Sequence, residues 1–352
     1  MNILIVRLSS LGDIIHALPA VPLLKEHFPE CTVDWVVEPA GAELLTGYPG
    51  IDRVIILKKK DIISSLRTGR IISAARCAAQ FVQKLRQRCY DVVLDFQGLF
   101  KSGLVVSAAR GRRKIGFANA REGAVWCYTE RVCAPAKNEH ALKRQLALLE
   151  GLGIAAQRIT YSRFFTASEE AELMTLLKRH GIDSTKPIVC VHPCSRWRTK
   201  QWELHKIAAL CDKLHTTCGA NVVLIGGTDE QCAVEAVAQQ CRMQVYCTAG
   251  ILSLHMVAAL LARSALLVSP DSGPLHLAGA LGIPVVGLFG PTAPWRTGPF
   301  GKHVAVVRKE LPCSPCFQRS SCPEGHHRCM RDITVAEVVE VCCNLIRKST
   351  ES

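Results

Sequence analysis

Ser269-Pro270-Asp271-Ser272-Gly273-Pro274-Leu275-His276 is the stretch on which the fold prediction rests. The apolar run before it, residues 264–268, is typical of a buried strand, and residues 277–282 after it indicate a helix ending in glycine. The stretch therefore joins the carboxyl end of a strand to a helix, which is where open α/β sheets bind ligands. Its Asp, Ser, Gly and His, and the free amide N–H groups at a helix start, suit a phosphate-containing ligand.

Strand and helix patterns alternate on both sides of this stretch. On the N-terminal side, strands are expected at residues 2–8, 31–38, 53–57, 91–95 and 114–117, and helices at 14–28, 40–46, 71–88, 103–109 and 140–152. A connecting segment with one helix at 168–180 leads to further strands at 188–192, 221–225, 244–247, 285–289 and 303–307 and helices at 202–217, 229–240 and 253–262.

This alternation predicts an α/β fold of two Rossmann-like doubly wound domains facing a central cleft. We place an N-terminal domain at residues 1–165 and a C-terminal domain at 166–333. A terminal helix within 334–352 can pack back on the N-terminal domain.

Length and composition point to a cytoplasmic protein. The 352 residues, 49% hydrophobic, suffice for two buried cores. The apolar run at the N-terminus is interrupted by Arg7 and is too short for a signal peptide, and no run of about 18 apolar residues predicts a transmembrane helix. Most of the 18 cysteines lie in apolar or helical contexts, where a reduced cysteine is a small hydrophobe.

The positive charge is concentrated in the first half of the chain. The net charge is +13, and residues 58–88 carry nine basic residues and one acid, Asp61. Residues 101–121 add six basic residues and no acid. Such a field favours a phosphorylated lipid or an anionic membrane face, although a solvated basic surface is the simpler alternative. Nucleic acid is not an expected partner, because no nucleic-acid-binding motif is present and aromatic residues make up only 6%.

Asp13 is the candidate general base. It follows Gly12 where the first strand gives way to a helix, and free amides and the helix dipole there stabilise a carboxylate. A sugar hydroxyl becomes a good nucleophile only when a placed carboxylate or His accepts its proton. The alternative is that Asp13 only caps the helix. His16 fits packing or orientation better than the role of base.

Two further loops at strand ends suit a phosphorylated ligand. Ser195 and Lys200, within residues 193–202, can bind phosphate oxygens and a diphosphate leaving group, unless they form only a basic helix cap. Glu230 can accept hydrogen bonds from ribose hydroxyls or act as a first-turn acid. The Gly226-Gly227 pair lacks the spaced glycines of a dinucleotide site, which disfavours an oxidoreductase. Residues 287–292 predict a turn beside the opening stretch.

A cluster of cysteines lies near the C-terminus. Cys313, Cys316, Cys322 and Cys329 surround His326 and His327, and a CxxC pair with further Cys and His indicates a structural zinc site. The spacing is irregular because no second CxxC follows. Reduced cysteines in a loop, or a disulfide, are the alternatives.

The loops together resemble the lipopolysaccharide heptosyltransferases, glycosyltransferase family 9. The matching segments, in family order, are residues 7–13 (RLSSLGD), 34–38 (DWVVE), 95–102 (DFQGLFKS), 120–122 (ARE), 195–202 (SRWRTKQW), 271–276 (DSGPLH) and 289–292 (FGPT). Each segment is short, but their ordered set spans nearly the whole chain. The N-terminal segments resemble heptosyltransferase I, which adds the first heptose of the inner core.

This resemblance implies an inverting, metal-independent glycosyltransferase of the two-domain GT-B fold. Its donor would be ADP-L-glycero-D-manno-heptose and its acceptor Kdo-lipid A, on the cytoplasmic face of the anionic inner membrane. Asp13 would be the catalytic base. The implied donor-binding residues are Ser195, Lys200, Glu230, Asp271, Ser272, Gly273 and His276, and the implied acceptor-binding residues are Ser10, Lys101 and Arg121. No cofactor would be needed for catalysis.

Two segments differ from the heptosyltransferase I pattern. The Cys-rich segment resembles heptosyltransferase II-like members, so transfer of the second heptose is an alternative function. Residues 196–199 are more basic than the corresponding acidic loops, so their donor contacts can differ.

Overall fold

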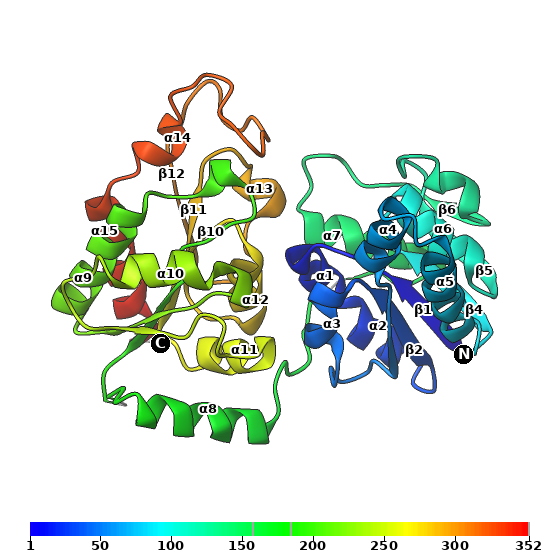
Figure 1. The fold of residues 1–352 in the computed structure, drawn as a ribbon, viewed down its shortest axis with the longest axis horizontal. Coiled ribbons are helices and arrows are strands. Elements are labelled where there is room, and N and C mark those ends of the chain that lie inside the picture. Colours follow the sequence, from blue (N-terminus) through cyan, green and yellow to red (C-terminus); the bar gives the residue numbers. More distant parts are fainter. Residues whose placement is uncertain (157, 184, 351–352) are drawn as a thin grey trace. The chain divides into compact units, whose positions relative to one another are not determined.

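The computed structural model describes residues 1–156, 158–183 and 185–350. The chain divides into two compact units, one ending at Arg163 and the next beginning at Phe164 (Figure 1). This boundary lies two residues before the one expected from the sequence.

The first unit is a parallel six-stranded sheet flanked by helices. Its strands are β1 (Asn2–Val6), β2 (Thr32–Val37), β3 (Arg53–Ile56), β4 (Tyr90–Asp95), β5 (Gly111–Phe117) and β6 (Glu130–Val132), in the order β3-β2-β1-β4-β5-β6. Its helices are α1 (Leu11–Ala17), α2 (Ala20–His27), α3 (Pro39–Leu45), α4 (Lys59–Arg67), α5 (Ile71–Leu85), α6 (Phe100–Ala108) and α7 (Ala141–Leu146), with 3₁₀ turns η1 (Ala124–Cys127) and η2 (Ala147–Leu152).

The second unit repeats this plan. Its parallel strands are β7 (Ile188–Val191), β8 (Asn221–Leu224), β9 (Val245–Cys247), β10 (Leu266–Pro270), β11 (Val285–Phe289) and β12 (Val304–Arg308), in the order β12-β11-β10-β7-β8-β9. Its helices are α8 (Ala167–Arg179), α9 (Leu204–Cys218), α10 (Gln231–Ala238), α11 (Leu254–Ala262), α12 (Gly273–Leu281), α13 (Pro294–Thr297), α14 (Arg328–Arg331) and α15 (Val335–Thr350), with 3₁₀ turns η3 (Arg198–Lys200) and η4 (Thr228–Glu230).

Both sheets are covered on their two faces, which explains their continuous apolar strands. Residues 3–6 of β1 are fully buried, and so are Leu266 and Leu267 of β10. Each sheet reverses its strand order beside its first strand, between β1 and β4 and between β7 and β10. Loops after these strands therefore lie at the switch points where doubly wound sheets bind ligands. The α/β fold of two doubly wound units is confirmed.

The structure corrects the expected position of the terminal helix. Helix α15 belongs to the second unit, where its Val338 and Cys342 are fully buried in the same apolar core as Val189 and Leu214. The apolar face of α15 is therefore covered within the second unit.

Two further differences have local causes. The helix expected at 14–28 is divided into α1 and α2 at Leu18-Pro19, because proline cannot donate the required backbone hydrogen bond. Helix α12 begins at Gly273, four residues earlier than expected, since Pro274 lies in its first turn, where no N–H is needed. Helix α4 and strand β6 were not predicted. None of the described helices is long and apolar enough to cross a membrane.

Candidate active site

Asp13 lies in the first turn of α1, close to the end of β1. Its Oδ1 forms an ion pair of 2.8 Å with Arg7 Nη2. Its Oδ2 accepts hydrogen bonds from the Ser10 hydroxyl at 2.9 Å and the Ser10 backbone N–H at 3.2 Å. Asp13 therefore caps the helix, as the alternative interpretation required, but it is also held by a buried cation.

The surroundings keep Asp13 ionised and accessible. Partial burial raises the pKa of this carboxyl, but the facing Arg7, then His16 and the Ser10 hydrogen bonds, lower it by more, so that the pKa lies below its ordinary value. The side chain remains 40% exposed. Because a carboxylate offers about four lone-pair sites, Asp13 can accept a substrate hydroxyl in addition to Ser10 and Arg7.

The loop before α1 is fixed from two neighbouring strands. Gln97 Oε1 accepts the backbone N–H groups of Leu8 at 3.1 Å and Ser9 at 3.2 Å. Lys101 Nζ donates to Ser9 Oγ at 2.9 Å and to Glu38 Oε1 at 2.8 Å. Two of the predicted acceptor residues, Ser10 and Lys101, thus lie in one network with Asp13.

Two other predicted residues have different surroundings. Arg121 is exposed, and its backbone N–H donates to the Gly98 carbonyl at 2.9 Å, which places it beside the turn after β4. His16 is buried, with its ring 5.5 Å from that of His140 in an edge-on arrangement. His16 therefore packs against His140 rather than presenting itself to a substrate.

In the second unit, Asp271 is the centre of a polar network. Its carboxylate is only 6% exposed, and Oδ2 accepts Lys200 Nζ at 2.7 Å and the Thr292 hydroxyl at 2.7 Å. His276 Nε2 lies 3.5 Å from Oδ1. Burial raises the pKa of Asp271, but His276 and Lys200 outweigh it and hold the pKa well below its usual range. Asp271 thus carries a buried negative charge that fixes the Lys200 ammonium.

His192, at the end of β7, connects two other loops of the site. Its Nε2 lies 3.1 Å from Glu230 Oε2, and its Nδ1 lies 3.1 Å from Ser272 Oγ. Burial raises the pKa of Glu230, but the contact with His192 outweighs this effect and the net pKa is lowered. Glu230 is therefore a carboxylate at neutral pH. The predicted donor residues Glu230 and Ser272 are therefore brought together by a histidine that the sequence did not single out.

The remaining predicted donor residues lie around the same loop. Gly273 is the first residue of α12, whose opening N–H groups favour an anion. The Ser195 hydroxyl donates to the Asp271 carbonyl at 3.4 Å. Lys200 Nζ also lies 4.2 Å from the ring centroid of Trp197, so its position is fixed from two sides.

A single segment forms hydrogen bonds with two loops of this network. We call residues 313–329 the Cys-rich segment; it is the orange loop beside α14 in Figure 1. The Thr199 hydroxyl donates to the Gln318 carbonyl at 2.6 Å, and His327 Nε2 donates to the Thr199 carbonyl at 2.7 Å. The Ser314 hydroxyl donates to the Gly290 carbonyl at 2.6 Å. The segment therefore holds the loop that carries Lys200 and the loop that carries Thr292.

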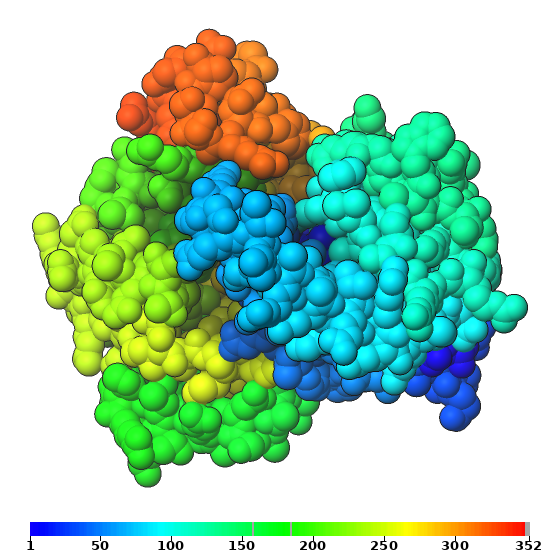
Figure 2. All heavy atoms as spheres, turned by 45° about the vertical axis from the view of Figure 1, so that its right-hand side comes forward, coloured from blue at the N-terminus to red at the C-terminus, as the bar shows by residue number. Residues whose placement is uncertain are grey.

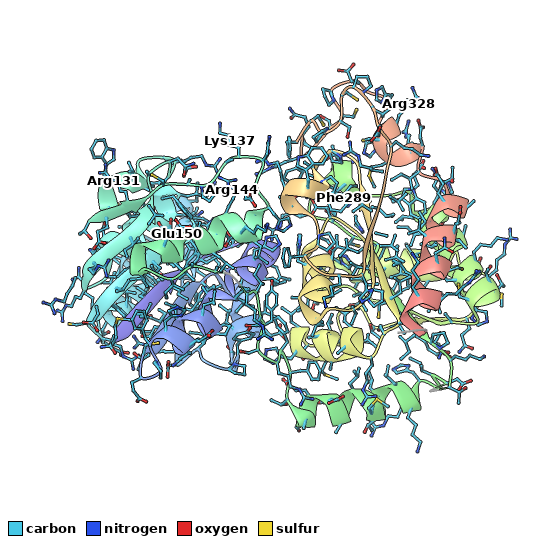
Figure 3. The ribbon with its side chains drawn as sticks, turned by 180° about the vertical axis from the view of Figure 1, so that it is seen from behind. Arg131, Lys137, Arg144, Glu150, Phe289 and Arg328 are labelled. Atoms are coloured by element: carbon cyan, nitrogen blue, oxygen red, sulfur yellow. The ribbon has the colours of Figure 1, made fainter. Side chains whose placement is uncertain are left out.

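The close contact at Gly290 depends on the absence of a side chain. A Cβ there would lie 2.6 Å from Met330 Sδ and 3.0 Å from Cys329 Sγ. Phe289, buried at the end of β11, and Arg328 of α14 are labelled in Figure 3 on the two elements that meet here. A larger residue at position 290 would therefore require the side chains of Met330 and Cys329 to shift.

The four cysteines of the segment are reduced and neighbour one another. Burial raises the pKa of the Cys329 thiol to about 11, and the thiols of Cys316, Cys322 and Cys313 add to this rise. However, among the residues that the structure describes, no group of three or more His, Cys, Asp or Glu side chains is arranged to hold a metal ion. The arrangement as it stands does not fit a metal, and the structural zinc stays a prediction.

Metal analysis of the purified, reduced protein tests the zinc prediction. If the Cys-rich segment binds zinc, we expect about one ion per chain. Chelation should then lower the temperature of thermal unfolding, because the loops of Thr199 and Gly290 would lose the contacts of the Cys-rich segment, and Cys316→Ser should reproduce this drop. Metal-free protein of normal thermal stability would refute the prediction, and Cys232→Ser, an exposed cysteine on α10, is the control.

Comparison with known proteins decides the family. Residues 78–327 match the family model described as glycosyltransferase family 9 (heptosyltransferase). The chain belongs to glycosyltransferase family 9. It is 29% identical over 330 residues to lipopolysaccharide heptosyltransferase 1 of Pseudomonas aeruginosa, covering 91% of this chain and 87% of that protein. The oxidoreductase alternative is thereby set aside.

Two solved heptosyltransferase structures share the fold. ADP-heptose lps heptosyltransferase II of Escherichia coli superposes with a TM-score of 0.78 at 22% identity, covering 99% of this chain and 100% of that one. The E. coli heptosyltransferase WaaC with ADP gives a TM-score of 0.74 at 24% identity over 98% of this chain and 100% of that one. These structures bear out the GT-B fold expected for a heptosyltransferase.

Several residues that organise this heptosyltransferase site were missed from the sequence. Arg7, Glu38 and Gln97 hold the loop of Asp13, and His192 joins Glu230 to Ser272. Each lies at or near the end of a strand that the sequence predicts. That position was the available signal, but the partner of each residue is set by tertiary contacts.

Proposed function

We propose that this protein transfers L-glycero-D-manno-heptose from ADP-heptose to the Kdo of lipid A with inversion of the anomeric carbon. The observation that carries the proposal is the relationship of nearly the whole chain to lipopolysaccharide heptosyltransferase 1 of P. aeruginosa within glycosyltransferase family 9. The Asp13 network in the first unit and the Asp271 network in the second supply the groups that this reaction needs.

In the proposed mechanism, the oxygen of a Kdo hydroxyl attacks the anomeric carbon of the heptose. Asp13 accepts the proton of that hydroxyl. The bond from that carbon to the diphosphate oxygen breaks, and ADP leaves with the electron pair. Asp13 is suited to this step because Arg7 and Ser10 fix its carboxylate while part of it stays exposed. Ser10, Lys101 and Arg121 would bind the acceptor's anionic groups.

The second unit supplies the electrostatic part of the mechanism. Lys200 and the N–H groups at the start of α12 would stabilise the charge on the departing diphosphate, a role that other enzymes give to a metal ion. Glu230 would accept the ribose hydroxyls. Asp271, Ser272, Gly273 and His276 would contact the heptose and diphosphate, with Ser195 beside them.

Acceptor choice tests the proposal and its alternative in one assay. The protein is incubated with ADP-heptose and either Kdo-lipid A or the same acceptor already carrying one heptose, and acceptor mass and ADP release are followed by mass spectrometry. We expect one heptose to be added to Kdo-lipid A. Transfer only to the heptosylated acceptor would assign heptosyltransferase II, to which the chain is also structurally similar. No transfer to either acceptor would overturn the proposal.

We also propose that the first unit binds the anionic inner membrane from its cytoplasmic face. Lys58 and Lys60 are exposed at the start of α4, and Lys59 is half-buried between them. Figure 2 shows α4 and the beginning of α5, in light blue, as an exposed ridge. Basic residues near a surface of anionic lipids contribute about 1 kcal/mol each.

Salt dependence checks this membrane contact. We expect binding to liposomes with anionic lipids to weaken steeply between roughly 0.1 M and 1 M salt, because the screening length falls from about 10 Å to about 3 Å. Lys58→Gln combined with Lys60→Gln should weaken binding by about tenfold to thirtyfold at the lower salt. Lys178→Gln with Arg179→Gln, two exposed residues of α8, is the matched control. Binding that is insensitive to salt would rule out electrostatic docking.

A further inference from the structure

The first unit contains a cavity whose apolar walls have no role in the proposed reaction. It has a volume of about 600 Å³ and lies between α4, α5 and α6. Eleven of its 14 lining residues are apolar, including Ile62, Phe81, Val82 and Leu104, and the other three are Lys59, Lys101 and Glu122. Its size falls within the range of about 300–1,000 Å³ that is typical of small-molecule sites.

The cavity opens to the surface through apolar side chains. Its inner wall includes core residues such as Val105, which is 3% exposed. At its mouth, Phe100 is 57% exposed and Leu104 54% exposed. Large apolar side chains left in water around a hollow indicate a ligand that covers them.

Lys101 connects the cavity to the candidate base. Lys101 lines the cavity, and its ammonium donates to Ser9 Oγ at 2.9 Å and to Glu38 Oε1 at 2.8 Å. Ser9 is followed directly by Ser10, whose hydroxyl donates to Asp13 at 2.9 Å. A molecule with one end in the cavity therefore has its other end within reach of the acceptor residues.

The charges around the cavity select the chemistry of the occupant. Lys59 lines it, and Lys58 and Lys60 are the neighbours of Lys59 at the start of α4. An apolar hollow beside basic side chains complements an amphiphile with an anionic headgroup. A free phosphate would leave the apolar walls uncovered, and a neutral apolar molecule would leave the lysines unused.

We propose that this cavity holds one acyl chain of the phosphorylated lipid acceptor while the acceptor sugar is presented to Asp13. The inference rests on the proposed function and names the part of the acceptor that the first unit binds. The phosphate lies near Lys59 and the acyl chain displaces water from Phe81, Phe100 and Leu104.

A cavity-filling variant tests this proposal. Ala78 of α5 lines the cavity, so Ala78→Trp should raise KM for acylated Kdo-lipid A by roughly tenfold, the loss of about 1.4 kcal/mol of binding. The same variant should leave kcat and KM for fully deacylated Kdo-lipid A within about twofold of the wild type. Ala79→Trp, the adjacent exposed residue, which does not line the cavity, is the matched control.

Comparing acylated with deacylated Kdo-lipid A distinguishes an error in the proposed acyl-chain site from an error in the proposed transferase function. Equal changes on both acceptors, or no change on either, would overturn the acyl-chain site while leaving the transferase function intact. No turnover of either acceptor by the wild type would overturn the function. Calorimetry with dodecyl phosphate and inorganic phosphate tests the cavity independently of turnover. Dodecyl phosphate should bind to the wild type, and this binding should be lost in Ala78→Trp. Equal binding of dodecyl phosphate and inorganic phosphate would refute the site.

Discussion

Replacing Asp13 with asparagine should lower kcat by about 10²- to 10⁴-fold while ADP binding is retained. Asparagine keeps the shape of the side chain and an oxygen for the Ser10 hydrogen bonds. It cannot accept the proton of the acceptor hydroxyl, and the residues proposed to bind ADP all lie in the second unit. Steady-state kinetics and calorimetry with ADP measure the two effects separately.

Asp13→Asn also removes the ionic partner of Arg7, so the stability of the variant must be measured as a control. Thermal unfolding of Asp13→Asn and of Glu150→Gln, which removes an exposed carboxylate from the same unit, shows how much structure is lost. A folded Asp13→Asn protein with wild-type turnover would remove Asp13 from the role of base.

The pH dependence of the same step follows from the lowered pKa of Asp13. The base is active when deprotonated, and its pKa lies below the ordinary value of about 3.9. Activity should therefore show no acid limb from Asp13 above about pH 5, and it should be lost only as the pH falls through the lowered pKa. A kcat that declines with an apparent pKa near 6 would point to a histidine instead.

Replacing Lys200 with methionine should have the second large effect, on binding and stability together. The Asp271 carboxylate would remain buried with Thr292 and His276 but without its ammonium partner. Removing one member of a buried ion pair costs about 3–5 kcal/mol of the free energy of unfolding. The variant should also lose ADP affinity, because the proposed diphosphate contact is gone.

A double variant separates these two effects. Lys200→Met with Asp271→Leu removes both buried charges, so much of the thermal stability should return, while ADP binding should stay weak. Lys213→Met, an exposed lysine of α9, is the control for loss of a positive charge. Full recovery of ADP binding in the double variant would show that Lys200 acts only by neutralising Asp271.

The same pair predicts how stability depends on pH. The pKa of Asp271 is lowered by folding, so its contribution is fully present above the unfolded value of about 3.9 and is lost as the pH falls through the folded value. The difference in unfolding temperature between the wild type and the double variant should therefore shrink only below about pH 4.

The fold was predictable wherever the hydrophobic pattern of the sequence was strong. Buried parallel strands such as β1 and β10 are nearly continuous apolar runs, and the sequence locates every strand of the two sheets except β6 to within a few residues. Helix α4 was missed because its sequence, KKDIISSLR, combines β-branched and serine residues that favour a helix only weakly. Strand β6 spans three residues, too few for a pattern to emerge.

The candidate site was predictable in location but not in connectivity. Strand ends identified Asp13, Lys200 and Asp271, because the topology of a doubly wound sheet fixes where its loops meet. The partners Arg7 and His192 could not be read from the sequence, since each pairing joins residues through packing rather than through spacing. The Gly290 contact likewise depends on a segment about 40 residues further along the chain.

The Cys-rich segment couples the loop of Lys200 to the loop of Thr292 through one short stretch of chain. Gln318 and His327 contact the loop of Lys200, while Ser314 contacts the loop of Gly290 and Thr292. Exchange of this short surface segment between relatives would thus reposition both loops at once, with Asp271 and Lys200 unaltered.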